Sequence, residues 1–457
     1  MTHQRSFKIC SGAAPEKVRK DLALLAEFED EGVSLGALNG LLKERLIPHL
    51  MRYDRPGFQS MFNSFPEKGA AFGARIALAY NQGVTNWQVS PGGAMLEELC
   101  CRALCRLFGL PAGADATFMY AGTYANQEAL YLALCRRAEA KGFDFGRKGF
   151  KGFRDPSRLA VLASEDAHFS IRAAVRMLGL GDESLVSMPV DENFRLDDEY
   201  LRNALPKLVR NRDIFCVVAT AGTTSTGAVD PIGAIADLCA RNGLWLHVDG
   251  AYGLAYSLVP EWAPLFSGYE RADSITWDPH KQLAVPIPSS ILFVRRRKEF
   301  ARMALHSAYF NKPDDPVPNP GLKSPPSTRM FAALSLVTSL RHQGMAKVVE
   351  RLRAPLVAVR ELAHLLEKKA DIELFHQPDT GILCFRFLNK DLSESGHAGL
   401  QQHIYDGIMR RGERTISLID VRGKKALRLV AVSPKVTAEA LKETIAEIRR
   451  RGKEYRP

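Results

Sequence analysis

ADSITWDPHKQL (residues 272–283) places Lys281 in a loop tightened by Pro279, directly after a short run with the pattern of a strand. A lysine between His280 and apolar neighbours is expected to be partly desolvated, which lowers the pKa of its amine and favours the nucleophilic form. Taken alone, such a lysine is more often a surface residue with a packed aliphatic stem. The segments around it therefore decide whether it belongs to a catalytic site.

Short apolar runs rich in Val, Ile and Leu recur on both sides of this loop. Their length and lack of alternation are typical of strands in a sheet that is covered on both faces. The runs are residues 158–163, 214–219, 244–249 and 290–294. A helical stretch, Asp230–Asn242, lies between two of them. We therefore predict an α/β fold with a mainly parallel sheet, and we assign the large domain to residues 66–325.

The remainder of the chain divides into two smaller parts. Residues 1–65 have a mostly helical pattern interrupted by prolines and are too short for an independent core, so we expect them to wrap the large domain. After a proline-rich loop at 311–326 we expect two long helices, and then a strand–helix–strand–helix pattern from 371 to 457. We assign residues 326–457 to a small C-terminal α/β domain.

The composition is that of a globular protein and argues against several other classes. The net charge is +11, with basic clusters at 295–298 and 449–456, but these lack the aromatic residues or known modules that usually accompany nucleic-acid binding. The 8 cysteines form no Cys-x-x-Cys pair, so we expect buried small hydrophobes and no metal site. The sequence has no signal-peptide core and no uncharged apolar run long enough for a bilayer. We expect a cytoplasmic protein that binds neither nucleic acid nor membrane.

A carboxylate follows one of the predicted strands. LHVDGAYG (246–253) ends the run in Asp249, and ligands of open α/β sheets bind at the carboxyl ends of strands. A carboxylate there needs a cation, which a protonated pyridine ring would supply. A helix cap or an ordinary ion pair is the competing interpretation. Ala251 is small enough to lie flat against such a ring.

Donors for an anion and an imidazole follow other predicted strands. MYAGTYANQEAL (119–130) enters a helix whose first amides, with the Thr123 hydroxyl, suit a phosphate, although Thr123 is equally suited to cap the helix. SEDAHFSIRAA (164–174) places His168 where it could stack on a ring and assist proton transfer, while most lone histidines are structural. An amine, a ring-nitrogen acid, phosphate donors and ring clamps are what pyridoxal 5′-phosphate (PLP) requires of a protein.

Together and in this order, the segments resemble the group II PLP-dependent amino-acid decarboxylases, which include aromatic-amino-acid, glutamate, cysteine-sulfinate and diaminobutyrate enzymes. The threonine-rich loop ATAGTTSTGAVDP (219–231) adds to this resemblance, which covers roughly residues 45–450. It implies PLP fold type I and a homodimer with the active site at the subunit boundary. It also implies a carboxy-lyase that converts an L-amino acid to the amine and CO₂.

The resemblance also implies roles for individual residues. Lys281 would form the Schiff base with PLP, Asp249 would pair with the pyridine nitrogen, and His168 would stack on the ring. The other positions assigned to the cofactor are Gly122, Thr123, Thr223, Ala251 and His280. Arg428, in ALRLVAVS (426–433), is similar to the small-domain arginine that meets a substrate carboxylate.

Three features depart from the family pattern. Ala121 replaces the first of two glycines before the phosphate threonine, and Asp278 and Gln282 stand where Asn and Trp are usual. The loop at 311–326 contains no tyrosine to protonate the α-carbon, although Tyr309 lies just before it. The missing tyrosine leaves open another PLP reaction, either decarboxylation-dependent oxidative deamination to an aldehyde or transamination. A non-catalytic binding protein with the same fold is a further alternative.

Overall fold

The computed structural model describes residues 8–306 and 317–456. The chain divides into two compact units. Unit 1 comprises residues 1–65, 354–377 and 381–457, and unit 2 comprises residues 66–353 and 378–380. Within the described residues, no helix is both long enough and apolar enough to cross a bilayer.

Unit 2 is built on a seven-stranded sheet with the strand order β1-β7-β6-β5-β4-β2-β3. Strands β3, β2, β4, β5 and β6 are parallel, whereas β7 is antiparallel to both of its neighbours. The strands are β1 (Asp115–Met119), β2 (Leu159–Ser164), β3 (Leu185–Met188), β4 (Asp213–Thr220), β5 (Trp245–Asp249), β6 (Ser274–Trp277) and β7 (Ser290–Val294). The predicted mainly parallel α/β sheet is confirmed, because all four predicted apolar runs form strands of this sheet.

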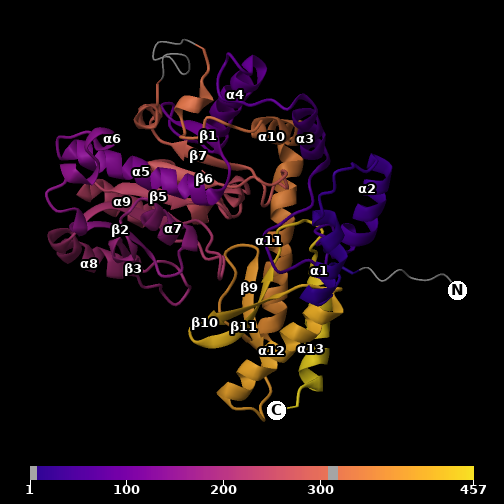
Figure 1. The fold of residues 1–457 in the computed structure, drawn as a ribbon. Helices are drawn as coiled ribbons and strands as arrows, with labels where there is room; N and C mark the ends of the chain where they lie inside the picture. Colours follow the sequence, from indigo (N-terminus) through magenta and orange to yellow (C-terminus); the bar gives the residue numbers. More distant parts are fainter. Residues whose placement is uncertain (1–7, 307–316, 457) are drawn as a thin grey trace. The chain divides into compact units, whose positions relative to one another are not determined.

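Helix α5 (Gly122–Ala140) lies across this sheet, where it contacts β1 and β4 to β7 (Figure 1). It shares an apolar core with α7 (Phe169–Met177) and with buried side chains of the strands. Helices α8 (Asp198–Asn211) and α9 (Ile232–Asn242) also pack against β4. Every residue of β1, β2, β5, β6 and β7 is buried, as expected for strands covered by helices.

The boundary of unit 2 differs from the assignment made from the sequence. Helix α10 (Ala332–Gln343), which we placed in the C-terminal domain, packs in unit 2 against α3 (Lys68–Tyr80) and α4 (Pro91–Leu107). Two glycines of α3 permit this close approach. A Cβ at Gly73 would lie 2.3 Å from the Thr338 hydroxyl, and one at Gly69 would lie 2.7 Å from the Cβ of His342. Unit 2 therefore continues into α11 (Met345–Glu367), as far as residue 353.

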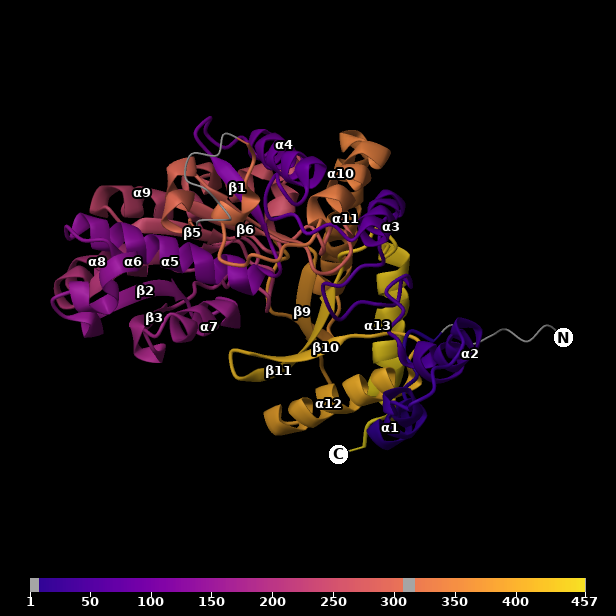
Figure 2. The ribbon, with the colours of Figure 1, turned by 45° about the horizontal axis from the view of Figure 1, so that its top comes forward.

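Unit 1 contains a four-stranded antiparallel sheet with the order β10-β11-β9-β8. Its strands are β8 (Ile372–Leu374), β9 (Ile382–Phe387), β10 (Ser417–Val421) and β11 (Lys424–Val430). Helices α12 (Glu394–Arg411) and α13 (Ala438–Glu454) pack together and against β9 (Figure 2). Residues 1–65 belong to this unit, because backbone hydrogen bonds join them to it, including Ile9 N to Gly412 O (2.6 Å) and Thr415 N to Gly57 O (2.9 Å).

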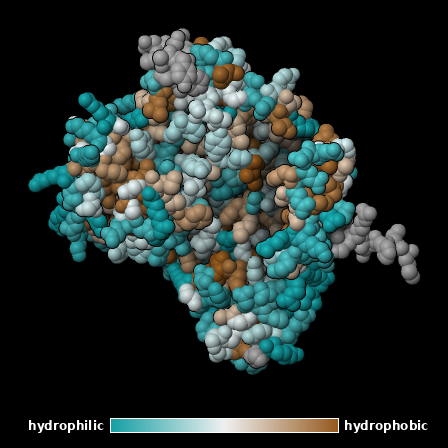
Figure 3. All heavy atoms as spheres, viewed as in Figure 1, coloured by the Kyte–Doolittle hydropathy of each residue, from teal (hydrophilic) through white to brown (hydrophobic). Residues whose placement is uncertain are grey.

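The basic end of the chain lies on α13. Arg450 and Arg451 both pair with Glu447 and Glu454 on the same helix, at 2.5 to 3.0 Å. Mostly hydrophilic residues cover the part of the face in Figure 3 where α12 and α13 lie in Figure 1. The cluster at 449–456 therefore contributes to a solvated helix surface, with much of its charge balanced locally.

Candidate active site

Lys281 lies in the loop that follows β6, next to a buried carboxylate. Its Nζ is 3.1 Å from Asp278 Oδ2, and its side chain is 20% exposed. The other oxygen, Asp278 Oδ1, accepts a hydrogen bond from the Ser290 hydroxyl at 2.6 Å. The carboxylate that replaces the usual Asn at this position therefore lies within reach of the Lys281 amine, where it can accept a proton.

The first turn of α5 lies against this carboxylate. A Cβ at Gly122 would lie 3.0 Å from both oxygens of Asp278, so a larger residue at this position would crowd the carboxylate. The cap residue of α5 is Ala121, whose side chain makes no capping bond, and Thr123 lies inside the helix. The alternative of a Thr123 cap is therefore wrong. Within the described residues the Gly122 and Thr123 amides make no backbone hydrogen bond, which leaves this helix start able to bind an anion.

Asp249 ends β5 as a carboxylate that is only 5% exposed. It accepts hydrogen bonds from Asn126 Nδ2 at 2.9 Å and from the Ala251 amide at 3.2 Å. No lysine or arginine of the described residues forms an ion pair with it. A buried carboxylate held in this way has room for a cationic partner, such as the protonated nitrogen of a pyridine ring.

A chain of buried hydrogen bonds fixes the Asn126 amide. Since the Asp249 carboxylate only accepts, the amide NH₂ faces it and Asn126 Oδ1 faces His247 Nε2, 3.0 Å away. His247 Nδ1 lies 2.9 Å from the Ser274 hydroxyl, which accepts from the Trp245 indole N–H at 2.8 Å. Burial lowers the pKa of His247 to about 4, so the ring is neutral. The Trp245 indole can only donate and the Asp249 carboxylate can only accept, so both ends of this series of hydrogen bonds impose the same direction.

The same amide also supports His168, the residue before α7. Asn126 Nδ2 lies 2.8 Å from the Ser170 hydroxyl, and that hydroxyl lies 2.8 Å from His168 Nδ1. The Ser170 amide donates to Nδ1 as well, at 3.2 Å. Nδ1 is thus an acceptor, and the proton of the neutral ring is on Nε2. Burial lowers the pKa of His168, although the nearby Asp249 charge opposes this shift.

Two further predicted residues are held by their own loops. The Thr223 hydroxyl is 3.0 Å from that of Thr226 and accepts from the Ala228 amide at 3.2 Å, so its contacts lie within the turn after β4. His280 Nδ1 lies 2.5 Å from the Ser289 carbonyl oxygen, and burial lowers the pKa of this imidazole. Both residues lie in unit 2 with Lys281, but these contacts join each side chain to its own loop and not to another residue of the site.

Arg428 belongs to unit 1, and its contacts within that unit are as follows. Its side chain is 5% exposed and donates to the Ser60 carbonyl oxygen at 3.1 Å and to the Ser417 hydroxyl at 3.3 Å. Its guanidinium carbon also lies 5.7 Å from the centre of the Phe62 ring. The other predicted feature on the substrate side, Tyr309, lies outside the described residues.

Sequence reasoning missed the residues that hold the site together, namely Asn126, Ser170, His247 and Ser274. All four are almost fully buried and polar. His247 stands in a run that is apolar up to its final Asp249, and this was the available signal. Ser274 follows Asp273 and begins a strand that also contains Thr276, so it gave no such signal. The pairing of these residues joins segments 27 to 123 residues apart, which the sequence alone does not reveal.

Comparison with known proteins identifies the family. The model of the pyridoxal-dependent decarboxylase conserved domain matches residues 15–388. The L-2,4-diaminobutyrate decarboxylase of Rhizobium meliloti (strain 1021) is 31% identical over 385 residues, covering 83% of this chain and 74% of that protein. Human cysteine sulfinic acid decarboxylase is 29% identical over 396 residues, covering 85% and 78%. The crystal structure of mouse CSAD has a TM-score of 0.89 at 26% identity, covering 98% of this chain and 94% of that one.

These findings favour decarboxylation over the other PLP reactions and over a non-catalytic protein. The fold agrees, since the structural neighbour matches nearly the whole chain with a TM-score of 0.89. The donor set agrees as well, because an unpaired buried carboxylate, an accessible lysine and an uncapped helix start fit the ring nitrogen, aldehyde and phosphate of PLP. The chain belongs to the pyridoxal-dependent decarboxylase family and is a PLP-dependent enzyme that decarboxylates an amino acid.

Proposed function

We propose that Lys281 holds PLP covalently through its amine, with Asp249 at the ring nitrogen and the start of α5 at the phosphate. The observation that carries this proposal is Asp249: it is buried, hydrogen bonded by Asn126, and without a cationic partner among the described residues. His168 and Ala251 are the proposed clamps on the ring faces. Gly122, Thr123 and His280 are the proposed phosphate residues, and Thr223 is proposed to lie near the ring oxygen or the substrate carboxylate.

Bound PLP supplies a ring that accepts the electron pair left when CO₂ departs. Asp249 keeps a proton on the ring nitrogen, and Asn126 holds the carboxylate in position for this. Asp278 accepts the proton that the Lys281 ammonium must lose before its amine can react. His168 presents its Nε2–H, since Nδ1 is occupied by Ser170. The residues thus divide the work between holding the ring and moving protons.

The substrate is an L-amino acid in this proposal, and the product is the corresponding amine. The two relatives are named for substrates with side chains of opposite charge, 2,4-diaminobutyrate and cysteine sulfinic acid. Family membership therefore does not select a side chain. Arg428 is the residue proposed to meet the substrate carboxylate, because a buried guanidinium suits a carboxylate.

We further propose that the enzyme is a cytoplasmic homodimer. All the cysteines, from Cys10 to Cys384, are free thiols, as is usual in a reducing compartment. The dimer follows from the resemblance to the family. Light scattering of the purified protein tests it, and a mass of one chain at micromolar concentration would contradict it.

Borohydride reduction of the purified enzyme tests the attachment residue. We expect the pyridoxyl group on the peptide that contains Lys281, and we expect the visible absorbance band to disappear in Lys281→Ala. Lys298→Ala, at an exposed lysine near the end of β7, is the matched control and should keep the band. Label on another lysine would overturn the assignment, and a labelled enzyme that releases no CO₂ from any amino acid would overturn the proposed turnover.

A further inference from the structure

Unit 2 contains a cavity of about 720 Å³ beside α5, and none of the residues assigned to the cofactor lines it. Its walls come from the end of β1, from α5, from residues 302–305 and from residues 324–330. They are mainly aromatic and apolar, and include Phe118, Met119, Tyr120, Tyr131, Met303 and Pro325. Among the described residues of these walls, only Glu128 carries a carboxyl group.

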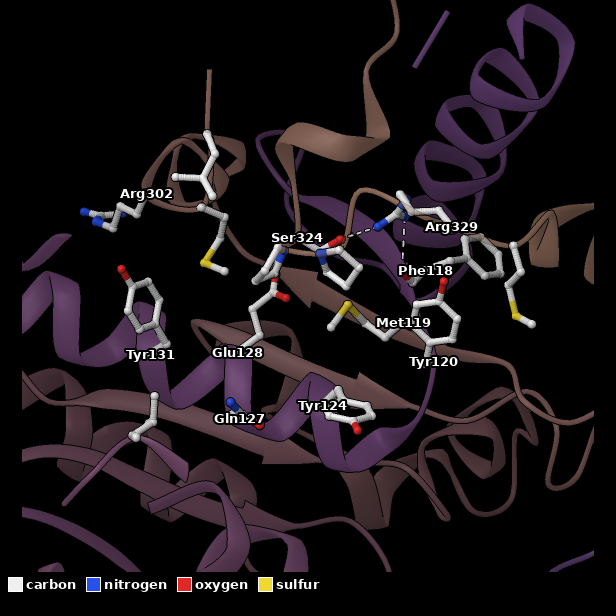
Figure 4. A pocket seen from close by; sticks show the side chains of 16 residues that line it. Phe118, Met119, Tyr120, Tyr124, Gln127, Glu128, Tyr131, Arg302, Ser324 and Arg329 are labelled. Atoms are coloured by element: carbon white, nitrogen blue, oxygen red, sulfur yellow. Dashed lines mark hydrogen bonds between the residues drawn. The ribbon is translucent and has the colours of Figure 1, made fainter. Parts of the chain in front are cut away.

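Glu128 is 5% exposed, and neither of its carboxyl oxygens has a hydrogen-bond partner in the described part of the chain. Figure 4 shows its side chain pointing from α5 into the space bounded by Tyr131, Met119 and Ser324. Asn126, two positions earlier, points instead to Asp249, as expected because residues two apart do not share a helix face. Glu128 is therefore not part of the network around Asp249.

The two arginines in the cavity wall are bonded elsewhere. Arg329 pairs with Glu97 and donates to Thr117 Oγ1 at 3.0 Å. It also bonds Ser324 and donates to the Phe118 carbonyl oxygen at 3.1 Å (Figure 4). Its charge acts on Glu128 more weakly than burial does, and burial raises the pKa of this carboxyl to about 8.

Arg302, the second arginine, is held in the same way by carboxylates outside the cavity. It donates to Glu139 at 2.7 Å and pairs with Glu299. Neither guanidinium forms an ion pair with Glu128, so an ionised carboxylate in this site has no partner among the described residues.

We propose that this cavity binds an organic ammonium ion with an apolar body, its cationic group on Glu128 and its body against the aromatic walls. A cation supplies the missing partner for the carboxylate, and the Tyr120 and Tyr131 rings favour cations through their faces. An amino acid carries a carboxylate that Glu128 would repel. The site therefore selects amines over amino acids.

Calorimetry with benzyltrimethylammonium on the PLP-loaded enzyme tests the proposal. This cation cannot condense with an aldehyde, so its heat of binding cannot come from reaction with the cofactor. At pH 9 we expect saturable binding of one cation per chain. Below pH 8 protonation of Glu128 competes, so the affinity should fall by up to about tenfold per pH unit.

Two variants and a neutral probe separate this site from general charge effects. Glu128→Gln keeps the shape of the side chain and should weaken binding by about tenfold or more. Glu199→Gln, at an exposed carboxylate on α8, should bind like the parent. Benzyl alcohol, which lacks the charge, should bind much more weakly.

The proposal is overturned by any of four results. The first is no binding of the cation at pH 9, which includes the case in which a second copy of the chain covers the cavity. The second is that Glu128→Gln binds the cation as tightly as the parent enzyme does. The others are that benzyl alcohol binds as tightly as the cation, and that the affinity for the cation does not depend on pH. If Glu128→Gln does not fold, the pH dependence and the neutral probe on the parent enzyme still decide.

Discussion

Helix α5 contributes to two sites that each contain a buried carboxyl group, and the two groups have different surroundings. Asp249 lies at the carboxyl end of β5, where Asn126 and the Ala251 amide bind it and a chain of hydrogen bonds reaches back to Trp245. Glu128 lies in an apolar cavity and has no hydrogen-bond partner among the described residues. Both are 5% exposed, so burial by itself does not distinguish them.

The difference concerns what each carboxyl group can do before a ligand arrives. Asp249 is oriented in advance by two N–H donors, as catalysis requires of a group that stabilises a cation. Glu128 has no such donors, so burial holds it in the neutral form and a cationic ligand must displace the proton. Hydrogen bonds from the protein, rather than depth, therefore determine which acid is prepared for catalysis.

Loss of the Asp249 charge should have the largest effect. Asp249→Asn removes the carboxylate proposed for the ring nitrogen, and we expect kcat to fall by about 10²–10³-fold while PLP remains attached. CO₂ release and the visible absorbance of the cofactor measure the two quantities. Asp237→Asn, at an exposed aspartate on α9, is the control. If Asp249→Asn keeps nearly full activity, Asp249 is no more prepared for catalysis than Glu128 is.

Neutralising Glu128 should instead stabilise the protein, by an amount that depends on pH. Its pKa of about 8 in the folded chain lies above its ordinary value of 4.5, so native stability falls as pH rises from 4.5 to 8. Glu128→Gln removes this loss. We expect its gain in unfolding free energy to be near zero at pH 4.5 and about 5 kcal/mol at pH 9, by urea denaturation.

Asp230 provides the opposite control. It is also fully buried, and burial raises its pKa to about 7, but its oxygens accept the Leu196 and Thr220 amides at 2.7 Å. Asp230→Asn should therefore destabilise the protein. Destabilisation by Glu128→Gln at pH 9 would show that an unseen partner serves this carboxyl.

Removal of the amide that orients Asp249 should have a smaller catalytic effect. Asn126→Ala deletes one hydrogen bond to a charged group, and we expect kcat to fall by about tenfold with little change in KM. His247→Phe breaks the same chain one step earlier and should give a loss of similar size. The double variant should lose no more than either single variant, because both act through the same amide. Additive losses would show that Asn126 and His247 affect kcat independently of each other.

Of these substitutions, Asp278→Asn should have the smallest effect, and the quantity it changes is the affinity for the cofactor. Asp278 lies 3.0 Å from the Cβ position of Gly122, at the helix start proposed for the phosphate. Removing this negative charge should tighten PLP binding to the apoenzyme by about fivefold, equivalent to about 1 kcal/mol. Fluorescence titration of the apoenzyme with PLP measures this affinity, with Glu199→Gln as the control. Weaker binding by the variant would mean that the contact of Asp278 with Lys281 outweighs its repulsion of the phosphate.

The sheet could be predicted well because buried parallel strands have a local signature. The run at 244–249 is apolar throughout except for His247 and its final Asp249, and both β5 and its end were placed correctly. The domain boundaries were harder to predict, since packing rather than composition decides them. Residues 326–353 belong to unit 2 because glycines of α3 accept α10, and residues 1–65 belong to unit 1 through backbone bonds to its strands and loops.

The sequence by itself determined the fold class, the cofactor and the order of the chemical groups, because each depends on residue types at short spacing: strand, loop, then Lys281, and strand, then Asp249. The tertiary structure alone decided which groups meet. Asn126 reaches Asp249 across 123 residues, and α5 turns Asn126 toward the site and Glu128 away from it. A helix places residues two apart on different faces, and only the packing of α5 against the sheet fixes which face meets the cofactor residues.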